Sequence, residues 1–287
     1  MPGLPRRYVE GLPQPARCLV MGVVNVTPDS FSDGGLWLEP EAAIEHGKAM
    51  LQEGADLVDV GGESTRPGAR RPSVDVELGR VLPVVTELSR AGAIVSVDTM
   101  RASVARAAVE AGAGVINDVS GGRADPDMLT TAASLGVPYI GMHWRGHSAS
   151  MHELTSYVDV VTDVIRELEP QIERALAAGI RPEHLVVDPG LGFAKTGDHN
   201  WTVLARIEEL HELGYPVLVG ASRKAFLGTL LADAEGRPRP AVHRDAASAV
   251  LAALAALSGV WCVRVHDVSP SIDAVKVAAR YGREPRP

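Results

Sequence analysis

The chain has 287 residues, of which 46% are hydrophobic and only 4% aromatic, and it carries a formal net charge of −8 at pH 7. This length is long for one ordinary domain but normal for an α/β barrel. The negative charge argues against nucleic acid as a partner, because phosphate backbones attract basic surfaces, whereas small anions are not excluded. The two cysteines, Cys18 and Cys262, stand inside apolar runs, so we expect buried free thiols rather than a disulfide framework.

The N-terminal stretch, residues 1–16, is expected to form a flexible arm before a single domain over residues 17–287. It contains Arg and Pro but no continuous apolar run, a composition typical of neither a signal peptide nor a membrane span. We therefore expect a cytoplasmic protein with no membrane partner.

Short β-branched runs recur along the chain, and each precedes a longer segment with helical periodicity. The predicted strands are CLVMGVVNV, LVDVGG, IVSVDT, VINDVS, YIGMH, LVVDPG, PVLVGAS and WCVRVHD. The predicted helices span 40–53, 74–89, 102–111, 127–135, 157–178, 201–213, 245–258 and 272–281. Glycines that close several of these helices are typical stops before the next strand.

This eightfold alternation predicts a (β/α)8 TIM barrel with parallel strands and its active site at the C-terminal rim. A doubly wound open sheet would show the same alternation, but no GxGxxG turn follows the first strand.

Polar residues stand where each predicted strand ends, and we expect them to converge on the mouth of the barrel. Any single one could instead cap the following helix. They are Asn25, Glu63, Asp98, Asn117, His143, Asp188, Ser222 and His266.

Two long loops are predicted to rise from this rim. NVTPDSFSDGG follows the first strand and carries more polar groups than a turn requires, including Asp29 and Asp33. GGESTRPGARRPS follows the second strand, and its Arg66, Arg70 and Arg71 fit an anion clamp, although a solvated basic loop is the alternative. WRGHSASMHELT and ADAEGRPRPAVHR are predicted to be surface loops without readable chemistry.

The ends of the seventh and eighth strands suggest a phosphate site. GASRK places Ser222, Arg223 and Lys224 where a helix begins, and barrel enzymes often bind phosphate with these loops. In RVHD, Arg264 and His266 are two residues apart, so they share one face of a strand.

With these motifs together, the chain resembles the bacterial dihydropteroate synthases. The matching motifs are NVTPDSFSDGG, VDVGGESTRPGA, VSVDT, NDVSGG, DPGLGFAK, GASRK and RVHDV, in the order that the family has. The resemblance covers the chain from about Cys18 to about Tyr281. It implies a transferase of folate biosynthesis that joins 6-hydroxymethyl-7,8-dihydropterin diphosphate to p-aminobenzoate, releasing pyrophosphate by an SN1-like substitution. Sulfonamides are its implied inhibitors.

The resemblance also implies which residues bind the pterin diphosphate. The carboxylate of Asp188 would accept both donors of the guanidine-like pterin edge, and Arg264 would lie over the ring. The full implied set is Thr65, Asp98, Asn117, Met142, Asp188, Phe193, Gly220, Lys224, Arg264 and His266.

The catalytic roles and the metal site follow from the same resemblance. Asn25 would help to hold Mg²⁺, the implied cofactor, against the diphosphate. Asp33 would stabilise the pterin cation that forms when the C–O bond breaks. The two long loops would close over the substrates as a mobile lid. The resemblance gives Asp29 no firm role. The implied catalytic residues are Asp33, Arg66, Lys224, Arg264 and His266, and the p-aminobenzoate pocket is Phe31, Thr65, Pro67, Phe193 and Ser222.

Two alternatives stay open at this point. A pterin-dependent methyltransferase would have a similar barrel and pterin pocket, and a non-catalytic pterin-binding paralogue would keep the fold without the reaction. The segment 246–258 is apolar nearly all round, which together with the resemblance predicts a homodimer, although packing within one subunit would also explain it.

Overall fold

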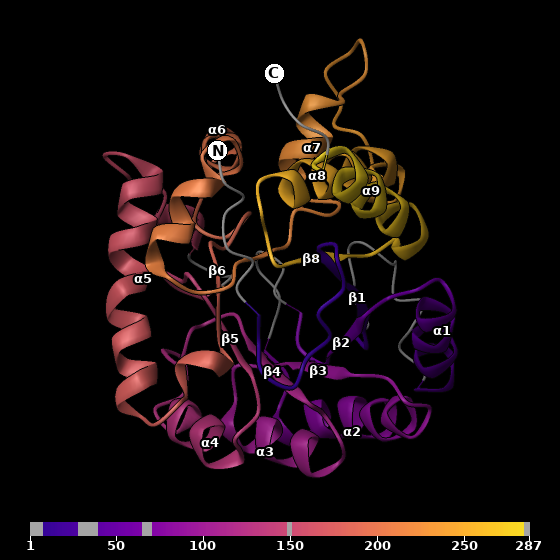
Figure 1. Cartoon of the computed structure of the whole chain (residues 1–287), viewed down its shortest axis with the longest axis vertical. Helices are drawn as coiled ribbons and strands as arrows, with labels where there is room; N and C mark the ends of the chain where they lie inside the picture. The colour runs from indigo at the N-terminus through magenta and orange to yellow at the C-terminus, as the bar shows by residue number, and fades with distance from the viewer. Residues whose placement is uncertain (1–7, 28–39, 65–70, 148–150, 284–287) are drawn as a thin grey trace.

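The computed structural model describes residues 8–27, 40–64, 71–147 and 151–283, and it contains eight parallel strands (Figure 1). Each predicted strand run contains one of them. The strands are β1 (Leu19–Asn25), β2 (Leu57–Gly61), β3 (Val95–Asp98), β4 (Val115–Asp118), β5 (Tyr139–Met142), β6 (Leu185–Asp188), β7 (Leu218–Val219) and β8 (Cys262–Val265).

The strands form a nearly closed barrel. Their order in the sheet is β6-β5-β4-β3-β2-β1-β8-β7, with every pairing parallel. A bridge between Val187 and Val217 joins the two ends of this order, and the amide of Val187 donates to the carbonyl of Pro216 at 3.0 Å. The fold predicted from the eightfold alternation is therefore confirmed.

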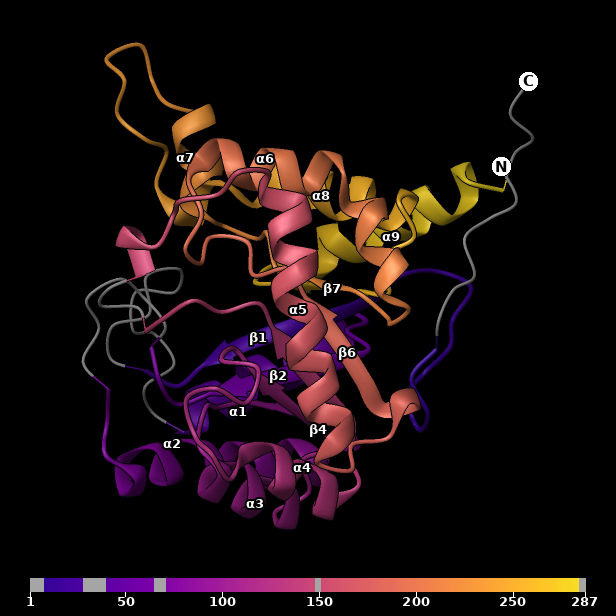
Figure 2. The same cartoon turned by 90° about the vertical axis from the view of Figure 1, so that its left-hand side faces the viewer.

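Helices lie outside the barrel, as the two perpendicular views show (Figures 1 and 2). No helix in the described ranges is long and apolar enough to cross a membrane. The helices are α1 (Pro40–Gln52), α2 (Val74–Arg90), α3 (Ala102–Glu110), α4 (Met128–Leu135), α5 (Val160–Ala177), α6 (Gly197–Ala205), α7 (Ala225–Leu230), α8 (Asp245–Leu257) and α9 (Val268–Tyr281).

Three helices differ from the prediction for local reasons. Helix α6 begins at Gly197, before the predicted start, because the hydroxyl of Thr196 caps it by accepting from the amide of His199 at 3.2 Å. Helix α9 also begins early, since Pro270 falls in its first turn, where amides have no helical partner to lose. Helix α7 begins directly after GASRK, where a helix start was predicted, but its range was not predicted because six residues are too few to show a periodicity.

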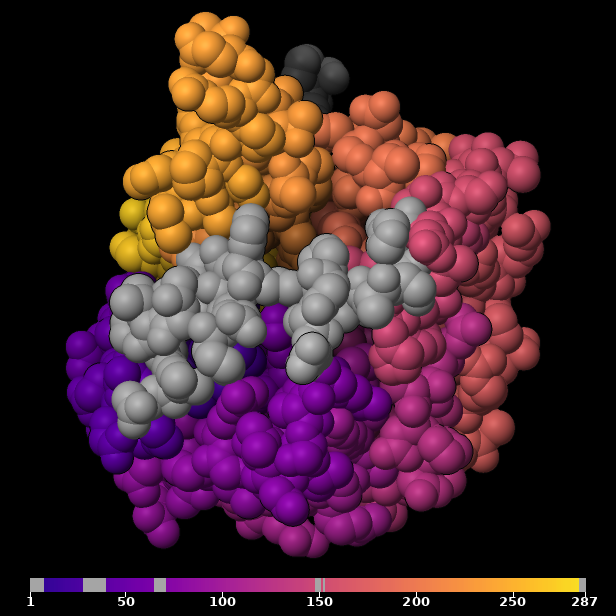
Figure 3. Space-filling view, turned by 180° about the vertical axis from the view of Figure 1, so that it is seen from behind, coloured from indigo at the N-terminus to yellow at the C-terminus, as the bar shows by residue number. Residues whose placement is uncertain are grey.

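The segment between α7 and α8 projects from the body of the protein, as the prediction of a surface loop requires (Figure 3).

An apolar layer fills the N-terminal end of the barrel interior. It comes from the first half of the strands, and each member is at least 98% buried. We call this set the lower layer: Leu19, Met21, Leu57, Val115, Ile140, Val186, Leu218 and Cys262.

The described part of the N-terminal arm packs against this lower layer. Val9 and Leu12 are buried in the same cluster, and the amide of Glu10 donates to the carbonyl of Glu183 at 3.0 Å. This differs from the flexible arm predicted over residues 1–16. Two apolar side chains that cover the open end of the interior hold residues 8–16 in place.

Candidate active site

A polar layer lies directly above the lower layer inside the barrel. Side chains two residues apart on a strand point to the same face, so each lower-layer residue is followed on the interior by the residue two positions later. Stepping two residues from Leu57, Val115, Ile140, Val186, Leu218 and Cys262 gives the set that we call the upper layer: Asp59, Asn117, Met142, Asp188, Gly220 and Arg264.

Arg264 of β8 joins this layer to its neighbours across the barrel. Its Nε donates to Oδ2 of Asp59 at 2.6 Å, and its Nη2 donates to Oδ2 of Asp98, at the end of β3, at 2.8 Å. The amide nitrogen of Asn117 donates to the same Asp59 oxygen at 3.0 Å. The other oxygen of Asp59, Oδ1, is buried without a hydrogen-bond partner among the described residues.

Burial sets the charge state of this cluster. It raises the pKa of Asp98 to about 7, with Asp59 adding repulsion, while the guanidinium of Arg264 opposes the shift. Asp98 can therefore either donate or accept a hydrogen bond near neutral pH. A ligand with donors toward this carboxyl would favour its ionised form.

Asp188 and Lys224 form the other side of the floor. Oδ1 of Asp188 accepts from the amide of Gly190 at 2.7 Å, and burial raises the pKa of this carboxyl while Lys224 opposes the rise. Burial, together with Arg264, lowers the pKa of Lys224 to about 8. The ammonium of Lys224 lies 4.4 Å from the ring centroid of Phe193, close enough for a cation–π contact.

The ends of β7 and β8 meet through Ser222 and His266. The hydroxyl of Ser222 lies 3.1 Å from Nδ1 of His266 and accepts from the amide of His266 at 3.2 Å. Burial, and then the charge of Arg223, lower the pKa of His266 well below its ordinary value. Arg223 itself pairs with Asp245, its Nε lying 2.6 Å from Oδ1, so part of its charge is already used.

These groups border a cavity of about 850 Å³ above the upper layer. Among its lining residues are many that the sequence predicted: Asn25, Asp98, Phe193, Gly220, Ser222, Lys224, Arg264 and His266. Asn117 and Asp188 lie in the buried floor, and Met142 packs in a small apolar cluster beside Phe193. The predicted residues Phe31, Asp33, Thr65, Arg66 and Pro67 lie outside the described residues, as do Asp29 and Arg70.

Besides the buried Asn117 and Asp188, two more of the predicted rim residues do not line this cavity. His143 is buried behind the wall, with Nε2 at 3.0 Å from the carboxylate of Glu167 on α5. Glu63 is paired with Arg71, at 3.0 Å between Oε2 and Nε. A polar residue at the end of a strand reaches the mouth of the barrel only if its side chain points inward. Residue type alone does not show which way the side chain points.

The structure also adds residues that the sequence analysis missed. Asp59 stands in the middle of β2. The feature that could have identified it in the sequence is a single carboxylate inside the apolar run LVDVGG. Lys195 and Met151 both line the cavity. Met151 belongs to WRGHSASMHELT, so this segment, which was predicted to be a surface loop, places one buried apolar side chain in the cavity wall.

Comparison with known proteins agrees with this geometry. Residues 21–266 match the model of the pterin binding enzyme family. The dihydropteroate synthase of Mycobacterium leprae is 56% identical over 263 residues, which are 91% of this chain and 93% of that protein. That of Escherichia coli is 42% identical over 259 residues, covering 90% of this chain and 89% of that protein.

Solved structures of similar proteins include bound ligands. The Yersinia pestis dihydropteroate synthase in complex with a sulfonamide drug matches with a TM-score of 0.89 at 41% identity, covering 95% of this chain and 98% of that one. The Xanthomonas albilineans enzyme in complex with 7,8-dihydropteroate matches with a TM-score of 0.83 at 43% identity, covering 98% and 100%. The chain therefore belongs to the pterin binding enzyme family and, within it, to the dihydropteroate synthases, which are transferases of folate biosynthesis.

Proposed function

We propose that the cavity above the upper layer is where 6-hydroxymethyl-7,8-dihydropterin diphosphate and p-aminobenzoate are joined to give 7,8-dihydropteroate and pyrophosphate. One observation carries this proposal. The buried carboxyl groups of Asp98 and Asp188 lie near the half-buried cations Lys224 and Arg264, and Asp98, Lys224 and Arg264 line a single cavity. Such a floor offers hydrogen bonds of both polarities to a flat heterocycle, while its cations suit an anionic tail.

The pterin is proposed to lie deepest, against the floor. Its ring N–H and exocyclic amine form an edge that a carboxylate accepts with two oxygens, and Asp188 has the burial needed to make that pairing strong. Asn117 and Asp98 would meet the remaining ring donors and acceptors. Phe193, with Lys224 against its ring, would form the side wall.

The diphosphate is proposed to lie toward Ser222, Arg264 and His266. All three line the cavity, and the imidazole of His266 is neutral in the free protein because its pKa is lowered. A bound diphosphate would favour the imidazolium and so gain a charge-assisted hydrogen bond. Arg66 is proposed to join this grip from the loop after β2.

Asn25 is proposed as the protein ligand of Mg²⁺. Its position at the end of β1, lining the same cavity as Arg264 and His266, fits a hard cation that takes few protein oxygens and completes its shell from phosphate and water. When bound, the cation would neutralise charge on the leaving diphosphate.

The substitution is proposed to be SN1-like. The C–O bond at the pterin methylene breaks with its electrons leaving on the diphosphate, and the amine of p-aminobenzoate then attacks the delocalised cation and loses a proton. No protein nucleophile is required. Both cysteines are buried, and burial raises the pKa of the Cys262 thiol well above its ordinary value, so neither is suited to covalent catalysis.

An assay of pyrophosphate release tests the proposed function. Release should require both substrates, and one mole of pyrophosphate should be released for each mole of 7,8-dihydropteroate formed. A sulfonamide drug is bound in the structure of the Yersinia pestis dihydropteroate synthase, and we expect sulfonamides to inhibit this protein in competition with p-aminobenzoate. Release that is independent of p-aminobenzoate would refute the synthase assignment and leave only a diphosphatase.

We also propose that the protein is a homodimer formed through α8 and α9. These helices pack against each other, yet each leaves a pair of apolar side chains on its outer surface. The exposed fractions are 60% for Val250, 54% for Leu254, 67% for Val277 and 65% for Tyr281. A second copy would cover this patch.

Light scattering at micromolar concentration tests the dimer. The parent protein should have twice the mass of one chain, and Leu254→Glu should reduce it to one chain without a large loss of thermal stability. A parent mass of one chain would contradict the proposal. We keep the cytoplasm as the proposed location, in line with two free cysteines, and fractionation of cells that express the protein tests it.

A further inference from the structure

A buried lysine in the cavity wall has no role in the mechanism above. Lys195 is 8% exposed, and its ammonium makes three contacts. Nζ lies 3.1 Å from the carbonyl oxygen of Gly190, 3.3 Å from that of Phe193 and 3.0 Å from Nδ1 of His143. An ammonium has three N–H groups, so each of its protons is already directed at a protein acceptor.

The two carbonyls belong to one strained turn. The amide of Phe193 donates to the carbonyl of Gly190 at 3.1 Å, and Gly190, Gly192 and Ala194 all have left-handed backbone angles, with φ of 70°, 77° and 47°. Ala194 is the costly member, because a residue with a β-carbon is disfavoured in this region of backbone angles. The contacts of Lys195 bridge both ends of the turn and offset that strain.

The contact with Glu167 fixes the tautomer of His143. The carboxylate of Glu167 only accepts, so the ring proton of His143 must lie on Nε2, and Nδ1 must accept from Lys195. Nε2 then donates to Oε2 of Glu167 at 3.0 Å. Burial and the charge of Lys195 lower the pKa of His143 to about 4, which agrees with a neutral ring at neutral pH.

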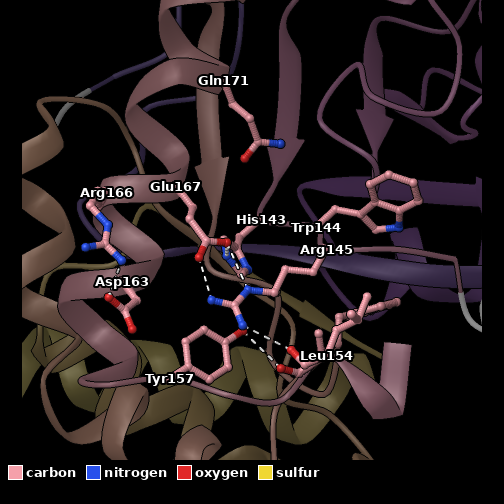
Figure 4. Close-up of polar contacts among 12 residues, drawn as sticks. His143, Trp144, Arg145, Leu154, Tyr157, Asp163, Arg166, Glu167 and Gln171 are labelled. Carbon is pink, nitrogen blue, oxygen red and sulfur yellow. Dashed lines mark hydrogen bonds and ion pairs between the residues drawn. The ribbon is translucent and has the colours of Figure 1, made fainter. Parts of the chain in front are cut away.

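Glu167 is held in turn by Arg145, as Figure 4 shows. Nε and Nη2 of Arg145 donate to its two oxygens at 2.9 and 2.5 Å. The guanidinium lies 3.7 Å from the ring centroid of Tyr157, and Nη1 donates to the carbonyls of Leu154 and Ser156 at 3.1 and 2.7 Å. The segment after β5 is thereby fixed to α5.

Tyr157 closes the chain of contacts. Its hydroxyl donates to the carbonyl of Ala194 at 3.0 Å, so the segment after β5 returns to the strained turn after β6. Two loops that both contribute to the cavity wall, through Met151 and Phe193, are linked through one buried polar network.

We propose that Lys195 is a positioning residue for the Gly190–Phe193 turn, and that His143 and Glu167 hold its ammonium in place from the far side of the cavity wall. This inference deepens the proposed function and rests on it for the kinetic readout alone. Lys195 holds Phe193 where the pterin and p-aminobenzoate meet, without giving a proton to either substrate.

Four variants separate positioning from packing. Lys195→Met removes the ammonium and keeps the length of the side chain. His143→Asn keeps an oxygen near the Nδ1 position that can accept from Lys195, whereas His143→Leu keeps apolar bulk and has no acceptor. Tyr139→Phe is the control, since it removes a 2.8 Å hydrogen bond to the buried carboxylate of Asp118 elsewhere in the barrel.

Hydrogen exchange of the free protein gives the first readout. The amides of Gly190, Gly192 and Phe193 are all hydrogen-bonded, to Asp188, Asn200 and Gly190, so this peptide should be protected. Its exchange should rise about tenfold or more in Lys195→Met and His143→Leu, by less in His143→Asn, and not in Tyr139→Phe. If His143 acted through packing alone, His143→Leu would raise the exchange rate less than His143→Asn.

Steady-state kinetics gives the second readout. The same order of variants should appear in KM for the pterin diphosphate, again about tenfold for Lys195→Met, with kcat changed less. Loss of pterin binding in Lys195→Met without faster exchange would overturn the proposal and make Lys195 a direct substrate ligand. An inactive parent protein would refute the proposed function, while the exchange data would still decide the role of Lys195.

Discussion

The lower and upper layers of the barrel occupy the same strands, the same interior face and positions only two residues apart, yet they differ in chemistry. The lower layer is apolar and at least 98% buried, and the N-terminal segment packs against it through Val9 and Leu12. The upper layer contains buried carboxyls, an amide and a guanidinium. One layer stabilises the fold by burial, and the other keeps charges in a place where they disfavour folding unless they are paired.

Stability and substrate binding therefore depend on different layers of the barrel interior. Burial opposes the charged forms of Asp98, Asp188 and Lys224 alike, since it raises the pKa of both acids and lowers that of the lysine. Such groups persist where a ligand completes their pairing. Substitutions in the lower layer should therefore reduce stability with little effect on substrate binding. Substitutions in the upper layer should weaken substrate binding with little effect on stability, unless they break an existing ion pair.

The largest effect is expected for Arg264→Met, which breaks such a pair. Asp59 and Asp98 would lose their shared cation, and breaking a buried ion pair destabilises proteins by about 3 to 5 kcal/mol. Urea unfolding at pH 7.5 measures the loss, and synthase activity should disappear with it. Arg264→Lys keeps a charge near the two carboxylates and should recover part of the stability. Equal losses in both variants would mean that packing, rather than charge, explains the effect.

A smaller effect is expected at the loop after β1, whose Phe31 and Asp33 lie outside the described residues. If they act only when the loop closes, Phe31→Ala should raise KM for p-aminobenzoate and Asp33→Ala should lower kcat, each by about tenfold, which corresponds to about 1.4 kcal/mol. Binding of the pterin diphosphate to the floor should be unchanged in both. Lower melting temperatures with normal kinetics would show a fixed structural turn instead of a lid.

A further effect concerns pH. The pKa of Asp98 is raised from 3.8 to about 7, so between these values the folded protein holds a proton that the unfolded chain releases. Stability from this group therefore falls as pH rises from about 4 to about 7. The parent should lose stability relative to Asp98→Asn between pH 5 and pH 8, measured by urea unfolding at each pH. Burial also lowers the pKa of Lys195 to about 7, but its contribution is the same in the parent and in Asp98→Asn, so it cancels in the difference between their unfolding free energies. A constant difference across this range would contradict the raised pKa.

Much of the fold could be predicted because its signals are local. Each strand is a short β-branched run, and most helices are long enough to show their period, whereas the six residues of α7 are not. Asp59 was missed because only the polar residue at the end of each run was considered, although the two-residue period connects it to Leu57 below.

The wall network could not be predicted for a different reason. His143, Glu167 and Lys195 come from β5, α5 and the loop after β6, and their contacts join residues 24 and 52 positions apart. The two-residue period puts His143 on the face opposite Met142, but nothing local in the sequence shows which residues lie against that face. The packing of α5 against β5 and β6 decides those partners.

The most direct test of the two-layer account compares Val186→Ala with Asp188→Asn. Both residues lie on β6 and point into the interior, one in each layer, and both are buried. Val186→Ala should lose about 1.5 to 3 kcal/mol of unfolding free energy and bind the pterin diphosphate like the parent. Asp188→Asn should keep its stability, because a buried charge is removed, and should lose about 1 to 3 kcal/mol or more of pterin binding in calorimetry, because an amide presents a donor where the pterin edge needs a second acceptor. Unchanged pterin binding by Asp188→Asn, or equal losses of stability and binding in both variants, would contradict the account.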